Sequence, residues 1–267
     1  MIKPATSNPA LQAPAQHAAA ADPALGLLPV WKLSDLYPAK DSPAFTADME
    51  KATTLSSAFE AKWKGRLAEA AAKTGPDGLG QALAEYEELE DLLGRIGSFA
   101  GLTYFSDTSS PANGKFFGDV QSKLTDLSAH LLFFALELNR IDDATMDAAL
   151  DRDPQAGHYR PWILDLRKDK PFQLDDRLEQ LFLEKSMTSA AAFNRLFDET
   201  MAELRFEIDG EKLPLELTLN MLQERDEPVR RKAAEALSKT FQQNIRVFTL
   251  ITNTLAKDKE ISDRWRG

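Results

Sequence analysis

The chain of 267 residues has no cysteine, only three histidines and no long apolar run. Without cysteine it can form no disulfide, no thiolate nucleophile and no cysteine-ligated zinc site, and this composition suits a reducing cytoplasm. Its longest apolar run covers residues 131–136, far short of the roughly 20 residues that span a bilayer. We therefore expect a cytoplasmic protein without a membrane partner.

Basic residues are also in deficit. Lysine and arginine number 32 against 42 aspartates and glutamates, which gives a formal net charge of −10. Such a balance repels a polyphosphate backbone, so we expect no nucleic-acid partner. The two basic clusters, at residues 167–170 and 230–232, are short, and we expect both to be solvated helix faces.

The three histidines, His17, His130 and His158, form no metal-binding motif. An H-E-x-x-H site needs two imidazoles one helical turn apart with a glutamate between them, and neither His130 nor His158 begins one. The positions three residues before them hold Leu127 and Gln155, not the acid that a di-iron bundle requires. The chain also lacks a G-x-S-x-G nucleophile elbow and a P-loop. We therefore predict no catalytic residue and no metal ligand in this chain, and the sequence leaves the substrate-binding residues undefined.

Apolar residues recur at helical spacing through most of the chain, which predicts a mainly α fold. Ser42-Pro43 and Ser110-Pro111 each place an N-cap before a proline at the first helical position, where the missing N–H costs nothing. Long helices with short connections pack as antiparallel neighbours, so the first half is predicted to be a bundle. The helices expected in the first half cover 43–64, 79–106, 111–140 and a short stretch, capped by Asp142 or Asp143, that ends near Leu150.

The second half is predicted to continue with helices and one short β-hairpin. The hairpin lies at residues 205–217, where five apolar residues alternate with polar ones around the turn-forming Asp209-Gly210. These five residues are Phe206, Ile208, Leu213, Leu215 and Leu217. The helices expected here cover about 154–170, 174–187, 189–204, a short turn at 219–223, and one long C-terminal helix from Glu227 to about Ile261.

These patterns divide the chain into four parts. Residues 1–28 are rich in alanine and proline, and we expect a disordered extension there. Residues 29–152 form the N-terminal helical bundle, and 153–204 form a further helical region. Residues 205–267 form the hairpin and the long helix.

Several segments together resemble one known family. They are WKLSDLYP at 31–38, the long helix at 116–141, HYRPWILDLRKDKPFQLDDRLEQLFLEKS at 158–186, FEIDGEKLPLELTLNMLQERDEPVRRKAAEAL at 206–237 and LAKDKEISDRWRG at 255–267. In order and spacing they resemble the N-terminal portion of the oligoendopeptidase F family, which is similar to thimet oligopeptidase. The segment at 153–204 resembles the N-terminal-type region of that family, and 205–267 resembles the start of its catalytic region.

The resemblance implies a zinc-dependent endopeptidase that admits short peptides into a deep channel and excludes folded proteins. In such enzymes zinc polarises the scissile carbonyl and its bound water, and a glutamate takes the proton. The family's H-E-x-x-H and its later glutamate ligand lie beyond residue 267, so no catalytic or metal residue transfers to this chain. We therefore expect the chain to wall one side of the channel, with a C-terminal catalytic half as its partner. Alone it is expected to bind no cofactor and to be inactive.

A function from another class fits the same residues. The acidic composition, the absence of catalytic motifs and the helical pattern are also typical of a stand-alone, non-catalytic scaffold or interaction protein. The reading frame beyond Gly267 separates the two hypotheses, because only the peptidase requires an H-E-x-x-H motif there.

Overall fold

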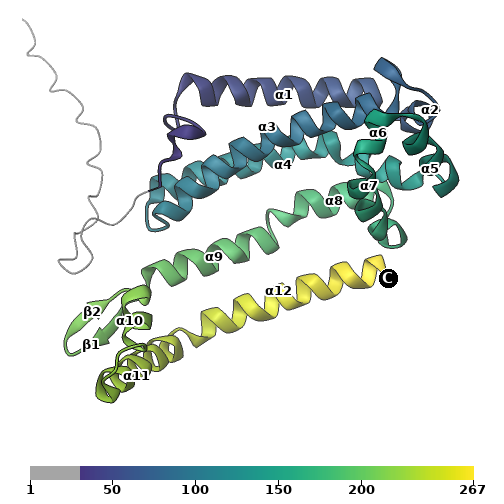
Figure 1. The fold of residues 1–267 in the computed structure, drawn as a ribbon. Coiled ribbons are helices and arrows are strands. Elements are labelled where there is room, and N and C mark those ends of the chain that lie inside the picture. Colours follow the sequence, from purple (N-terminus) through teal and green to yellow (C-terminus); the bar gives the residue numbers. More distant parts are fainter. Residues whose placement is uncertain (1–30) are drawn as a thin grey trace, which may run out of the picture. The chain divides into compact units, whose positions relative to one another are not determined.

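Three long helices form the body of the first half in the computed structural model, which describes residues 31–267. The extension predicted for residues 1–28 lies outside the described residues. The helices α1, α3 and α4 pack against one another and run side by side in Figure 1. The elements of this half are η1 (Leu33–Asp35), α1 (Pro43–Trp63), α2 (Leu67–Ala70), η2 (Gly75–Asp77), α3 (Leu79–Ser106), α4 (Pro111–Arg140) and α5 (Asp143–Arg152).

The predicted helix starts are confirmed, and each has the expected side-chain cap. Ser42 Oγ accepts a hydrogen bond from the Phe45 N–H at 3.3 Å, and Ser110 Oγ accepts one from the Asn113 N–H at 3.3 Å. Asp142 caps α5 by accepting from the Thr145 N–H at 2.9 Å. These bonds satisfy N–H groups that have no partner inside the helix.

Aromatic rings fill the centre of the bundle. Tyr86 of α3 stacks on Phe134 of α4 with ring centroids 4.4 Å apart, and Phe59 of α1 meets Phe134 edge-on at 5.2 Å. Gly97 lets the helices approach, because a Cβ there would lie 3.2 Å from Leu124 Cδ1. Burial of these rings supplies the apolar area on which the bundle depends.

The helix predicted over 154–170 is wrong as a single element. It is three short pieces. Pro161 accounts for the first break, because it has no N–H to donate to the preceding turn and its ring crowds the carbonyl there. The pieces and the elements that follow are α6 (Pro154–His158), α7 (Arg160–Leu166), η3 (Arg167–Phe172), α8 (Asp176–Ser186) and α9 (Ala190–Glu203).

The basic cluster at 167–170 is not wholly a solvated face, which corrects the prediction for Arg167. Its side chain is only 10% exposed, and its guanidinium donates to the carbonyl oxygens of Leu138 at 2.7 Å and Ile141 at 2.6 Å while pairing with Asp143. The last carbonyls of a helix have no partner inside it, so this arginine closes the C-terminus of α4. Lys168 beside it is 75% exposed, as expected of a solvated face.

The hairpin is confirmed but is shorter than predicted. Strands β1 (Phe206–Ile208) and β2 (Glu211–Leu213) pair antiparallel, with Phe206 opposite Leu213. Asp209 and Gly210 both have positive φ, 52° and 88°, as a two-residue hairpin turn of the right twist requires. Leu215 and Leu217 are helical instead, because Pro214 ends the pairing and precedes α10 (Leu215–Met221).

The long C-terminal helix is present, but it does not run unbroken from Glu227. Asn244 separates α11 (Glu227–Gln243) from α12 (Ile245–Arg266) with φ −104° and ψ 8°. Phe241 and Phe248 face each other across this bend with centroids 5.9 Å apart. The bend directs α12 along α9, beside which it runs in Figure 1. Within residues 31–267 no helix is both long and apolar enough to cross a membrane.

Arg167 provides a test of the cap on α4. Replacing it with alanine (Arg167→Ala) is expected to lower the free energy of unfolding by about 2 kcal/mol, because two carbonyl oxygens lose charged donors. Guanidinium chloride unfolding measures the change. The matched control is Lys168→Ala at the exposed neighbour, and an equal loss in both variants would contradict the assignment.

Candidate functional site in the cleft between α4 and α9

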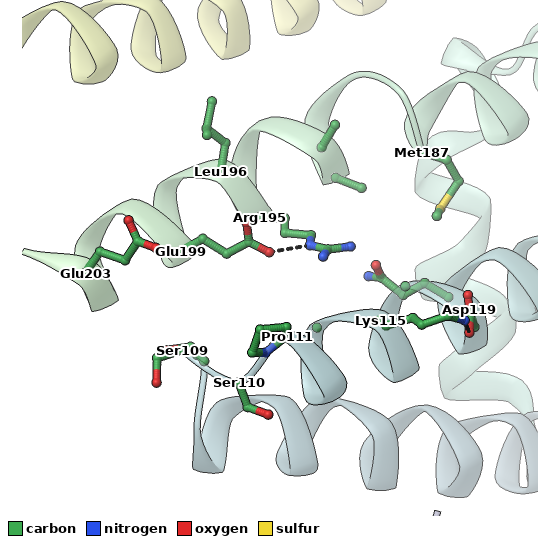
Figure 2. A pocket seen from close by; sticks show the side chains of 16 residues that line it. Ser109, Ser110, Pro111, Lys115, Asp119, Met187, Arg195, Leu196, Glu199 and Glu203 are labelled. Atoms are coloured by element: carbon green, nitrogen blue, oxygen red, sulfur yellow. Dashed lines mark hydrogen bonds and ion pairs between the residues drawn. The ribbon is translucent and has the colours of Figure 1, made fainter.

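A cleft of about 870 Å³ lies between the start of α4 and the length of α9. One wall is the first three turns of α4 with the loop before it, and the other is α9 together with Met187, which precedes it. Figure 2 shows Arg195 projecting from α9 towards α4, with Pro111 and Lys115 on the opposite side. The cleft is therefore lined by charged side chains as well as apolar ones.

Arg195 is the central side chain of this cleft. Its Nε donates to Glu199 Oε1 at 2.7 Å, one helical turn further along α9. A Cβ at Gly118 would lie 2.9 Å from Nη1, and one at Gly114 would lie 3.2 Å from Nη2. Both are closer than side-chain atoms normally approach, so the guanidinium can lie against α4 because these two positions are glycine.

The remaining charges of the cleft are carboxylates and one lysine. Lys115 pairs with Asp119 on α4. Glu203, at the end of α9, lines the cleft but has no hydrogen bond or ion pair with any other residue of 31–267. The cleft is thus lined by two cations, Lys115 and Arg195, and by three carboxylates. Asp119 is paired with Lys115 and Glu199 is paired with Arg195.

Two titratable groups near Arg195 and Glu199, Tyr104 and Asp198, have raised pKa values. Tyr104 is buried, and burial raises the pKa of its hydroxyl, with Glu199 and Asp198 of α9 raising it further. Burial and the adjacent Glu199 also raise the pKa of Asp198. The Tyr104 hydroxyl has no hydrogen-bond partner in the described part of the chain, and its ring stacks on Phe117 at 4.9 Å. Tyr104 and Asp198 do not form a pair of nucleophile and base.

The histidines do not contribute to this cleft. His130 Nδ1 lies 2.5 Å from Glu60 Oε2 on the far side of the bundle, and the His158 ring lies edge-on to Tyr159. His17 lies outside the described residues. Among residues 31–267 no three histidine, aspartate or glutamate side chains come together as a metal site would require. The zinc implied by the family resemblance therefore does not fit the described residues.

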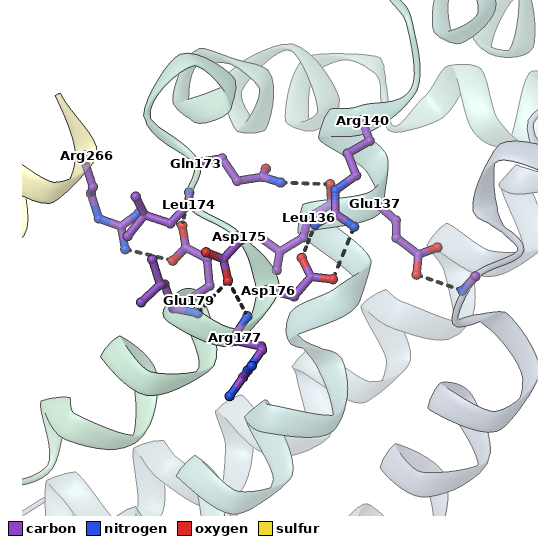
Figure 3. A network of polar contacts seen from close by, with 12 residues as sticks. Leu136, Glu137, Arg140, Gln173, Leu174, Asp175, Asp176, Arg177, Glu179 and Arg266 are labelled. Atoms are coloured by element: carbon purple, nitrogen blue, oxygen red, sulfur yellow. Dashed lines mark hydrogen bonds and ion pairs between the residues drawn. The ribbon is translucent and has the colours of Figure 1, made fainter.

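A second polar network ties α12 to the start of α8 (Figure 3). Arg266 donates through Nη1 and Nη2 to the two carboxylate oxygens of Glu179 at 2.6 and 2.8 Å. Glu179 also accepts from the Leu174 N–H at 2.9 Å, and Arg140 of α4 pairs with Asp176 of α8. The bidentate pair with Arg266 holds the pKa of Glu179 below its ordinary value.

Sequence reasoning identified neither of these features. The sequence contains only two signals of the cleft. Gly114 and Gly118 lie one turn apart in a helical pattern, and Arg195 and Glu199 have the same spacing. Both pairs are typical of ordinary helix surfaces. The spacing alone cannot show that the two pairs face each other.

Comparison with solved structures shows first that this fold is shared with a known protein. The solved structure of oligoendopeptidase-F from Enterococcus faecium superposes with a TM-score of 0.70 at 19% identity, over 84% of this chain and 44% of that one. A second solved structure, from Chlamydophila abortus, gives a TM-score of 0.49 at 16% identity, over 88% of this chain and 40% of that one. No curated protein sequence matches the chain.

A family model matches a shorter segment. Residues 137–206 match the model of the M3 peptidase N-terminal region, described as Oligopeptidase F. This segment runs from the end of α4 through α9 and contains Glu179, Arg195 and Glu199. The resemblance to the N-terminal portion of a peptidase family, oligoendopeptidase F, is thereby confirmed, and the chain spans less than half the length of the solved oligoendopeptidase.

Glu179 provides a test of the second network. The pKa of Glu179 is lower in the folded protein than in the unfolded chain. The stabilisation from its ionised carboxylate is therefore complete above the ordinary carboxyl pKa of about 4.3. It is lost as the pH falls through the lower folded-state pKa. Glu179→Gln is expected to lower the free energy of unfolding by about 2 kcal/mol at pH 7. This difference should shrink as the pH falls below about 4, which urea unfolding across a pH series measures.

The control for this series is Glu260→Gln on α12. Glu260 pairs with Lys257 and Arg264 at the solvated surface. Its replacement should therefore change the free energy of unfolding little at any pH of the series. A difference between the wild type and Glu179→Gln that stays constant with pH would contradict the role assigned to the Glu179 carboxylate.

Proposed function

We propose that this chain is the N-terminal part of a zinc-dependent oligoendopeptidase that hydrolyses short peptides, and that it forms part of the substrate-channel wall. The observation that supports this most directly is the match of residues 137–206 to the oligopeptidase F family model. The shared fold over 84% of the chain is consistent with it.

The low burial of α9 and α12 supports a role as one wall of a larger enzyme. Within the described chain α9 has no buried residue, and Ile251 is the single buried residue of α12. Phe197 and Leu250 are 42% and 57% exposed. Exposed apolar side chains on adjacent helices are typical of surfaces that another segment covers. In this proposal a C-terminal catalytic half covers α9 and α12.

The catalytic zinc would bind to residues of that C-terminal half. The described residues bring no three metal donors together, so this chain contributes shape and surface rather than ligands. When bound, the zinc would polarise the peptide carbonyl and its attacking water. The chain's cysteine-free composition supports a cytoplasmic location, and its net charge of −10 argues against a nucleic-acid partner.

Peptide hydrolysis tests the proposal. The chain alone, incubated with zinc and a quenched fluorescent peptide, is expected to show no turnover above the buffer control. A protein that continues in the same reading frame to an H-E-x-x-H motif is expected to cleave the peptide, and a chelator should abolish the cleavage. Chelator-sensitive turnover by the chain alone would contradict the assignment of catalysis to the other half.

Metal content gives a separate test. The untagged chain, dialysed against zinc and then against buffer, is expected to retain well below one zinc ion per molecule, because it lacks a three-donor site in residues 31–267. Elemental mass spectrometry measures the ratio. Stoichiometric zinc would show that the described residues, or residues 1–30, form a metal site.

The alternative is a stand-alone scaffold or interaction protein without catalysis. The exposed apolar side chains of α9 and α12 fit that function as well. A stop codon directly after Gly267 in the gene would favour it, whereas a continuing frame with H-E-x-x-H favours the peptidase.

A further inference from the structure

We propose that the α4–α9 cleft binds a short peptide by its two free ends, with Arg195 holding the terminal carboxylate and Glu203 holding the terminal ammonium. This deepens the proposed function, on which it rests for the choice of short peptides as ligands. The site needs neither zinc nor the catalytic half, because every group that it uses lies in α4 and α9.

Arg195 is presented as a carboxylate receptor. Glu199 engages only Nε, and Nη1 and Nη2 make no hydrogen bond within the described residues. The two terminal nitrogens therefore keep their donors for a carboxylate, which a guanidinium binds with two parallel hydrogen bonds. Glu199 orients the side chain through Nε, and the guanidinium lies close to the backbone of α4 at Gly114 and Gly118.

The charge balance of the cleft favours a zwitterion over a simple anion. Lys115 is paired with Asp119, and Arg195 with Glu199, so Glu203 is left as an uncompensated carboxylate. This net negative charge would repel a simple anion. A peptide with free ends brings one positive and one negative group, and its ammonium neutralises Glu203.

The spacing of the two groups sets the length of the peptide. Arg195 and Glu203 are eight residues apart on α9, which corresponds to about 12 Å along the helix axis. An extended chain advances about 3.3 Å per residue, so about four residues bridge the two groups. Between them along α9 the cleft is lined by Leu196 and by Glu199, so the middle of the peptide meets one apolar side chain and the carboxylate that is already paired with Arg195.

Binding to four forms of tetra-alanine tests the proposal with the chain alone. The forms have both ends free, an acetylated N-terminus, an amidated C-terminus, or both ends blocked. NMR titration follows binding through the backbone amides of Gly114 and Gly118 in the cleft wall. The peptide with free ends is expected to bind tightest, and blocking either end should weaken binding about tenfold.

The variants assign each end to its residue. In Arg195→Gln the amidated and free-acid peptides should bind equally, while acetylation still weakens binding. In Glu203→Gln acetylation should lose its effect, while amidation still weakens binding. The matched control is Arg231→Gln on α11, which removes an exposed arginine paired with Glu227 at the same one-turn spacing and should leave all four affinities unchanged.

Equal binding of all four peptides, or no shift of the Gly114 and Gly118 amides with any of them, would overturn the proposal. Equal effects of both blocking groups in Arg195→Gln and Glu203→Gln would overturn the assignment of the ends. None of these outcomes bears on peptide hydrolysis, so the proposed function is judged separately by its turnover assay.

Discussion

The closure of α4 at its carboxyl end is the interaction on which the arrangement of the second half depends. A 30-residue helix ends there with carbonyl groups that have no partner inside it, and Arg167, which follows α5, α6 and α7 in the chain, supplies two charged donors. This arginine therefore terminates α4 and fixes η3 to it in one contact. α8 begins at Asp176, shortly after η3, and packs on α4 directly, with the Arg140–Asp176 ion pair as a second link between the two helices.

Ion pairs connect several of the helices in this acidic protein. Arg140 joins α4 to α8, and Arg266 joins α12 to Glu179 at the start of α8. The bundle, in contrast, is held by aromatic packing. The second half has a smaller apolar cluster of its own, in which Phe206 and Ile208 of the hairpin pack with Leu237 of α11. The α-helices with the lowest burial there are α9 and α12.

Local chemistry made the first half predictable from the sequence. Ser42-Pro43 and Ser110-Pro111 specify helix starts through caps and a missing N–H, and the bounds of α3 and α4 follow from a long, regular apolar stripe. The predicted helix bounds were wrong where a single residue interrupts a helix although the helical spacing of apolar residues continues. Pro161 divides one predicted helix, and Asn244 bends another without a proline or glycine to signal it.

The candidate site was beyond sequence reasoning for a different reason. Arg167 and Arg195 each sit in a helical stretch of mixed charge, where a solvated side chain is the usual outcome. What distinguishes them is a partner about 30 residues or more away: the end of α4 for Arg167, and two glycines of α4 for Arg195. Such pairings are decided by how helices pack, and no local pattern records them.

The two glycines also limit how the cleft can change by mutation. Any substitution at Gly118 adds atoms, and its first added carbon would already lie 2.9 Å from the Arg195 guanidinium. Single substitutions at this position can therefore only narrow the cleft or expel the arginine from it. The width of the cleft at Arg195 is already at the maximum that this helix backbone permits.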